Sequence, residues 1–142
     1  MLHRWLEIAS TPSVKAVRAR YGSAAQYGRL DRTLDPDGPV RNDRIGEAEA
    51  AFIAGQDGFY LASVSETGWP YVQYRGGPAG FLRVIDERTL GYAEFRGNRQ
   101  YVTTGNVAMN DRVSLFLMDY AHQRLCCMDR LVGWLALRGG VA

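Results

Sequence analysis

The sequence predicts a mainly β protein of the α+β class, built as an antiparallel barrel or half-barrel with helices in front of it. Helical patterns come first along the chain, short strands joined by hairpin-length turns begin at Gly58, and one helical segment interrupts the strands. The 142 residues, of which 46% are hydrophobic and 23% charged, are typical of one globular domain. A chain of this length can bury a core without disulfides or metals.

The first third of the chain predicts three short helices and a linker. A Thr-Pro pair can cap and open a helix over residues 11–22, and an S-x-x-Q capping box can open a second helix over residues 23–27. Residues 34–43 are rich in Pro, Gly and Asp, which favours a linker. A third helix is expected over residues 47–55, where small apolar residues precede a glycine.

From Gly58 onward the alternation of apolar and polar residues predicts strands. The expected elements are strands over residues 59–65, 69–75, 81–85 and 90–95, a helix over residues 99–107 behind Asn98, and a strand over residues 112–120. The short connections predict two successive hairpins, followed by the inserted helix and a fifth strand.

Charge and cysteine content exclude several classes of protein. The 17 basic and 15 acidic residues leave a net charge of +2, far from the clustered positive charge of a nucleic-acid-binding protein. Cys126 and Cys127 are neighbours, so an unstrained disulfide between them is excluded and a reducing compartment is expected. Arg4 and Glu7 interrupt the apolar residues at the N-terminus, so we expect neither a signal peptide nor a membrane span, and a cytoplasmic location.

No metal site and no dedicated catalytic acid or base are predicted. His3 and His122 have no partner at the spacing of metal ligands or of a catalytic triad. The adjacent Cys126 and Cys127 lack the C-x-x-C spacing of a zinc site, and two small buried thiols are the simpler interpretation.

The segment that leads into the inserted helix has the pattern of an anion site. A strand runs into Asn98, a residue that can cap a helix, and the helix is expected to open with Arg99 and Gln100. Unpaired N–H groups and the helix dipole at such an end attract a phosphate, and an arginine strengthens the site. The alternative is that Asn98 only caps the helix and Arg99 is a solvated surface charge.

The strand over residues 69–75 points to a ligand beside a sheet. The two-residue alternation places Gln73 and Arg75 on one face, and Gly76 and Gly77 follow them. Glycines without side chains can leave space for a planar ligand, with Gln73 and Arg75 as polar partners. The alternative is a β-bulge or wide turn at the rim of a barrel.

Two segments carry a resemblance to a known family. Residues 57–84 read DGFYLASVSETGWPYVQYRGGPAGFLRV, residues 86–106 read DERTLGYAEFRGNRQYVTTGN, and NDRVSLFLMDY follows. They resemble the pyridoxamine 5′-phosphate oxidase-like family of FMN-binding split barrels, and more narrowly its bacterial branch with RGGP-x-GF and GNRQY-x-[ST]-TGN motifs. The resemblance is strong over residues 48–120.

This resemblance implies an antiparallel split β-barrel that forms a homodimer, with one FMN in a groove at each side of the subunit interface. Carried over by motif, Gln73, Tyr74, Arg75 and Gly76 would line the isoalloxazine ring, Arg99 and Gln100 would hold the phosphate, and Thr103 and Thr104 would support that end. Hydride or electron transfer would belong to FMN, while the protein would supply orientation and hydrogen bonds. The catalytic residues stay unknown.

Residues 121–142 depart from the family pattern. The family continues with a basic stretch, two further strands and an N-C-P-Q-H-I motif, whereas this chain reads AHQRLCCMDRLVGWLALRGGVA. The expected domains are a helical extension with a linker at 1–46, a split barrel at 47–120 and a divergent tail at 121–142. A change of reading frame or a truncation would explain the tail. An incomplete barrel would then leave the strand LFLMDY, residues 115–120, as an unpaired edge.

The sequence therefore predicts a cytoplasmic FMN-binding flavoprotein, an FMN-dependent oxidoreductase with an unknown small-molecule substrate. The alternative from another class is a non-catalytic flavin carrier, or a truncated barrel without flavin activity. A groove that accepts haem or a deazaflavin, as other split barrels do, is a third interpretation.

Overall fold

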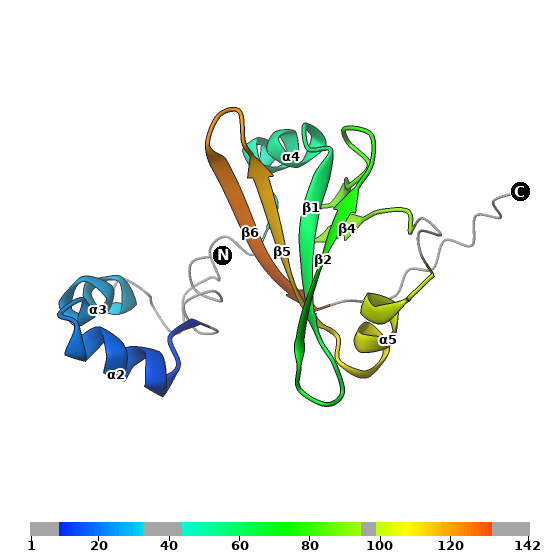
Figure 1. Ribbon diagram of the computed structural model, residues 1–142. Coiled ribbons are helices and arrows are strands. Elements are labelled where there is room, and N and C mark those ends of the chain that lie inside the picture. The colour runs from blue at the N-terminus through cyan, green and yellow to red at the C-terminus, as the bar shows by residue number, and fades with distance from the viewer. Residues whose placement is uncertain (1–8, 33–43, 95–98, 132–142) are drawn as a thin grey trace, which may run out of the picture.

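Two antiparallel sheets and several short helices make up the protein in a computed structural model that describes residues 9–32, 44–94 and 99–131 (Figure 1). The helices are α2 (Pro12–Arg20), α3 (Ala24–Arg32), α4 (Glu47–Ala54) and α5 (Val102–Met109). The strands are β1 (Gly58–Val64), β2 (Pro70–Gly76), β3 (Arg83–Asp86), β4 (Thr89–Gly91), β5 (Arg112–Asp119) and β6 (Arg124–Leu131). One sheet has the order β2-β1-β5-β6 and the other pairs β3 with β4. The predicted α+β class and the unclosed antiparallel barrel are confirmed.

Helices α2 and α3 form a hairpin that stands clear of the two sheets in Figure 1. Thr11 caps α2 as predicted, because its hydroxyl accepts from the Val14 amide at 3.4 Å. Gly22 has a φ of +79°, a left-handed conformation that ends the helical turn. Helix α3 extends to Arg32, beyond the predicted end at residue 27, and the predicted linker lies largely outside the described residues.

The core lies on one face of the larger sheet. Residues in β1 alternate between buried and exposed, and β5 follows the same alternation, so their inward side chains form one apolar layer. The buried residues of this layer and its neighbours are Ile45, Ile53, Phe59, Leu61, Leu82, Val107, Val113, Leu115 and Leu117. Helix α4 begins and ends where predicted, and Ile53 is its buried residue.

An aromatic cluster joins the smaller sheet to the larger one. The ring of Phe59 in β1 stacks on Phe81 with centroids 5.6 Å apart, and it meets Tyr92 edge-on at 5.3 Å. Tyr92 comes directly after Gly91, the last residue of β4. This cluster brings the segment behind β4 toward β2, where the candidate site lies.

The inserted helix begins later than predicted. We expected it to open with Arg99, but α5 starts at Val102. Arg99 has a φ of 57° and Tyr101 a φ of 51°, and these left-handed conformations interrupt a right-handed helix. Asn98, the predicted cap, lies outside the described residues.

The prediction of an unpaired edge at residues 115–120 is wrong. Strand β6 pairs with β5 along its whole length, from Asp119 opposite Arg124 to Arg112 opposite Leu131. The first part of the segment that we expected to be a divergent tail therefore completes the larger sheet, and β6 forms its edge (Figure 1).

Candidate functional site

A cavity of about 160 Å³ opens beside β2. Its lining residues come from β2, from the loop behind it and from the segment behind β4: Gln73, Tyr74, Arg75, Gly76, Phe81, Tyr92 and Ala93. The four residues that the resemblance assigned to the isoalloxazine ring thus share one wall. The volume is below the roughly 300–1,000 Å³ of most ligand pockets. The cavity as described can therefore enclose only part of a flavin.

Arg75 is the charged centre of this cavity. Its side chain is only 14% exposed, and its Nη2 donates to Glu94 Oε1 at 3.1 Å. Its guanidinium carbon lies 5.7 Å from the ring centroid of Tyr92. The buried Nε of Arg75 has no hydrogen-bond partner within the described part of the chain. A buried donor without a partner is costly, so Arg75 retains capacity to bind an acceptor from a ligand.

Two threonines in the first turn of α5 tie the helix to this wall. Thr103 is buried, and its hydroxyl donates to Gln73 Oε1 at 2.9 Å. The hydroxyl of Thr104 donates to Glu94 Oε1 at 3.1 Å. The structure therefore links the residues predicted to bind the ring with those predicted to support the phosphate end.

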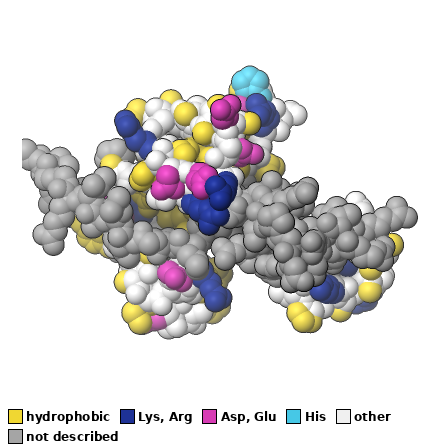
Figure 2. Space-filling model, turned by 180° about the vertical axis from the view of Figure 1, so that it is seen from behind, with side chains coloured by type: hydrophobic (Ala, Val, Ile, Leu, Met, Phe, Trp, Pro, Cys, Tyr) yellow, Lys and Arg dark blue, Asp and Glu magenta, His cyan; other side chains and the backbone are white. Residues whose placement is uncertain are grey.

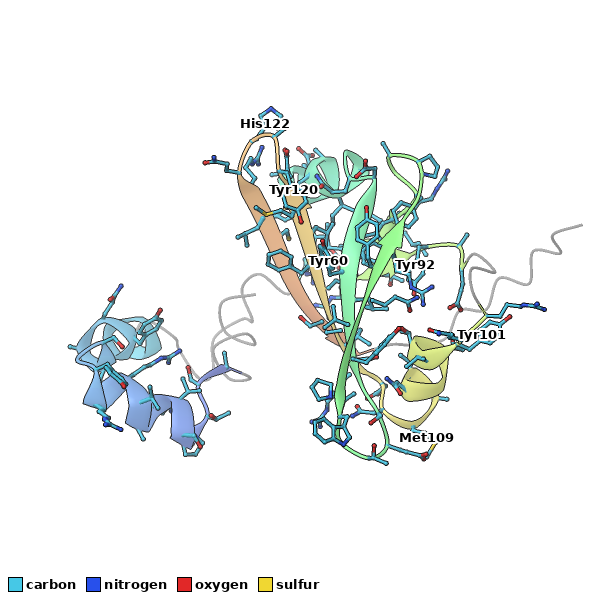
Figure 3. All side chains as sticks on the ribbon, viewed as in Figure 1. Tyr60, Tyr92, Tyr101, Met109, Tyr120 and His122 are labelled. Carbon is cyan, nitrogen blue, oxygen red and sulfur yellow. The ribbon has the colours of Figure 1, made fainter. Side chains whose placement is uncertain are left out.

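Arg99 and Gln100 lie ahead of α5 and neither lines the cavity. The side chain of Arg99 is exposed. This agrees with the alternative of a solvated surface charge, and it also leaves the guanidinium accessible to a phosphate. Figure 3 shows Tyr101, which follows them, at the end of α5. Their role toward a phosphate stays a prediction.

The open space predicted at the two glycines is filled by aromatic rings of the chain itself. A Cβ added at Gly76 would lie 2.9 Å from Cε1 of Tyr74, and one at Gly77 would lie 2.7 Å from Cγ of Phe81. The ring of Tyr74 also lies against Gly58, which pairs with Gly76 across the two strands. The glycines therefore let the protein's own rings approach the backbone, and a planar ligand over Gly76 requires the Tyr74 ring to move.

Tyr92 and Glu94 are site residues that the sequence analysis did not identify. Burial raises the pKa of Tyr92, and the positive charge of Arg75 opposes this rise, so the phenol stays protonated at neutral pH. Tyr92 lines the cavity beside β2 (Figure 3). Their spacing in the sequence could have indicated that they lie together, because two positions in an extended segment place Tyr92 and Glu94 on the same side.

Among the residues that the structure describes, no group of three or more His, Cys, Asp or Glu side chains could hold a metal ion. His122 lies at the turn between β5 and β6 (Figure 3), with its Nδ1 2.7 Å from Asp119 Oδ2. Figure 2 shows a histidine at the edge of the molecule with acidic side chains close by. Neither His122 nor Asp119 lines the cavity. No described helix is long and apolar enough to cross a membrane.

The chain matches the model of a known family. The family model described as pyridoxamine 5′-phosphate oxidase matches residues 45–142, which is more than half of the chain. The matched range includes residues 121–142, where we expected the resemblance to have ended. Neither the curated proteins nor the solved structures gave a match to the chain.

Proposed function

Because the chain belongs to the pyridoxamine 5′-phosphate oxidase family, we propose that it binds FMN beside β2 and acts as an FMN-dependent oxidoreductase. The RGGP and GNRQY motifs support its assignment to the bacterial branch of this family. The observation that carries the proposal is the buried Nε of Arg75, an unpartnered donor on the wall of the cavity. The unpaired donor and the neighbouring amide of Gln73 suit acceptor atoms of a flavin nucleotide.

When bound, FMN supplies the hydride or electron transfer, and the chain supplies orientation and hydrogen bonds. The hydroxyl of Thr103 donates to Oε1 of Gln73, and this hydrogen bond fixes the orientation of the side-chain amide. Arg75 is fixed by Glu94 and by the ring of Tyr92. Arg99 and Gln100 remain our candidates for the phosphate end.

We further propose that the protein works as a homodimer in the cytoplasm. The outer face of the larger sheet exposes the side chains of Tyr60, Val72, Tyr74, Phe116, Tyr120 and Leu125. An exposed apolar surface of this kind is typical of an interaction site. A second copy on this face would cover these exposed side chains.

The alternative, a flavin carrier or a barrel without flavin activity, is favoured by one observation. The Tyr74 ring occupies the space over Gly76 that a flat ligand would need. The absorption spectrum of the purified protein, combined with the mass of any cofactor released on denaturation, tests the proposal. Flavin bands and the mass of FMN support it, while a colourless protein that gains no flavin on titration contradicts it. A spectrum of haem or a deazaflavin would replace FMN with that cofactor.

Oxidoreductase activity is tested separately from binding. After reduction by dithionite, the bound FMN should pass its electrons to an added acceptor faster than free reduced FMN does. Tight FMN binding without any turnover would support the carrier. The mass of the particle in solution, measured by light scattering, tests the homodimer.

A further inference from the structure

Two donors from different elements converge on one carboxylate oxygen at the edge of the cavity. Nη2 of Arg75 in β2 and Oγ1 of Thr104 in α5 each lie 3.1 Å from Oε1 of Glu94. A guanidinium and a hydroxyl that meet at one point are a donor set suited to a phosphate or carboxylate oxygen. Glu94 itself is 38% exposed at its side chain, whereas Arg75 is 14% exposed. The guanidinium is therefore largely buried, and the carboxylate contacts it from the more exposed side of the ion pair.

One carboxylate does not satisfy this donor set. The Nε of Arg75 is buried and has no partner among the described residues. Thr104 lies in the first turn of α5, which contains no acidic residue and whose capping residue, Tyr101, makes no side-chain cap hydrogen bond. The positive end of the helix dipole adds to the attraction for an anion at this point. A phosphate, with three acceptor oxygens and up to two charges, satisfies such a site better than one carboxylate oxygen.

We propose that Glu94 is a built-in competitor for a phosphate-binding subsite formed by Arg75 and Thr104. In the ligand-free protein its carboxylate occupies the place of one phosphate oxygen, and a phosphate monoester must displace it. Glu94 therefore lowers the affinity for phosphorylated ligands and prevents Arg75 from being left as an unpaired buried charge. The identity of the ligand as FMN rests on the proposed function. The inference also moves Arg75 from the ring edge, where the resemblance placed it, to the anionic end.

The test compares Glu94→Gln with the unmodified protein by flavin titration. The substitution keeps the size of the side chain and removes the charge that repels a phosphate. We expect the affinity for FMN to rise by about 2-fold to 5-fold, which lies in the range of a partly exposed ion pair. The affinity for riboflavin, which has no phosphate, should change by less than about 2-fold. Adding Thr104→Val should abolish the gain.

Glu87→Gln is the matched control, because it removes the same charge at an exposed ion pair with Arg44 outside the cavity wall. It should leave the affinity for FMN unchanged. Should Glu94→Gln fail to fold, Glu94→Asp serves in its place. The shorter carboxylate cannot reach both donors, so a smaller gain in FMN affinity is expected. An unchanged or weaker FMN affinity, or an equal gain for riboflavin, would overturn the inference.

A second arm does not depend on flavin. Inorganic phosphate, compared with chloride at equal ionic strength, should raise the unfolding temperature of Glu94→Gln more than that of the unmodified protein. If no variant binds flavin but phosphate stabilises Glu94→Gln selectively, the proposed function fails and the phosphate subsite stands. If flavin binds but neither FMN nor phosphate favours Glu94→Gln, the subsite fails and the proposed function stands.

Discussion

A buried hydrogen bond anchors α5, and its removal should destabilise the whole fold. Nδ2 of Asn106 donates to Oγ of Ser63 in β1 at 3.1 Å, and the two residues are 9% and 2% exposed. Ser63→Ala removes the acceptor and leaves the amide of Asn106 buried without it. Such an unsatisfied donor costs about 1–3 kcal/mol. Because α5 carries Thr103 and Thr104, the same change should weaken the support of the candidate site.

Urea unfolding followed by circular dichroism measures this loss. With a denaturant slope of about 2 kcal/mol per M, a loss of about 1–3 kcal/mol lowers the midpoint by roughly 0.5–1.5 M. Ser65→Ala is the control, because its hydroxyl contacts Thr67 and the Trp69 amide in the exposed β1–β2 turn, where water can replace them. It should cost less than about 1 kcal/mol.

The double variant Ser63→Ala with Asn106→Leu separates the hydrogen bond from packing. Replacing both partners by apolar groups of similar shape is nearly neutral in favourable cases, so the double variant should recover part of the stability that Ser63→Ala loses. Equal losses for Ser63→Ala and Ser65→Ala would refute the reasoning, since water would then satisfy Asn106.

Three further predictions concern the site and the surface. Arg99→Ala should weaken FMN binding by about 1.5–3 kcal/mol and leave riboflavin binding nearly unchanged; equal losses in the two titrations would exclude a phosphate contact. Gly76→Val should displace the ring of Tyr74 and lower flavin affinity more than stability, and a large drop in unfolding temperature with unchanged affinity of the folded protein would show that Gly76 serves the backbone alone. The hydrogen bond from His122 lowers the pKa of Asp119, so this contact stabilises the fold above the ordinary value of 3.8 and is lost as the pH falls through the lowered pKa. Asp119→Asn should therefore lose less stability than the unmodified protein between about pH 4 and pH 2 in acid titrations.

Local signals were sufficient to predict the first hairpin. Gly68 at the turn has a φ of +86°, a conformation that suits glycine, and the strands on either side pair in the expected antiparallel manner. The alternation in β2 placed Gln73 and Arg75 on one face, and both line the cavity. The occupant of the space over Gly76 could not be predicted, because it depends on the rotamer of Tyr74.

Strand β6 was missed because strand pairing is a property of two segments. Residues 121–142 lack the family motif, and we therefore expected a divergent tail there. Arg124–Leu131 forms a strand because it pairs with β5 along its whole length. Without β6, the outer N–H and C=O groups of β5 would be unpaired. They can pair with an extended segment that a short turn brings alongside. A tight turn at residues 120–123, where Gln123 has a φ of 53°, provides that reach.

The contact between Arg75 and Glu94 follows from the same kind of long-range placement, but its chemistry was visible in the sequence. Tyr92 and Glu94, two positions apart, share one side of an extended segment. A largely buried arginine requires an opposite charge, and Glu94 is an acidic residue in the segment behind the hairpin that follows β2. Pairing the charges of successive hairpins, before looking for ligand-binding patterns, would therefore have identified Glu94 as the partner that any anionic ligand of Arg75 has to replace.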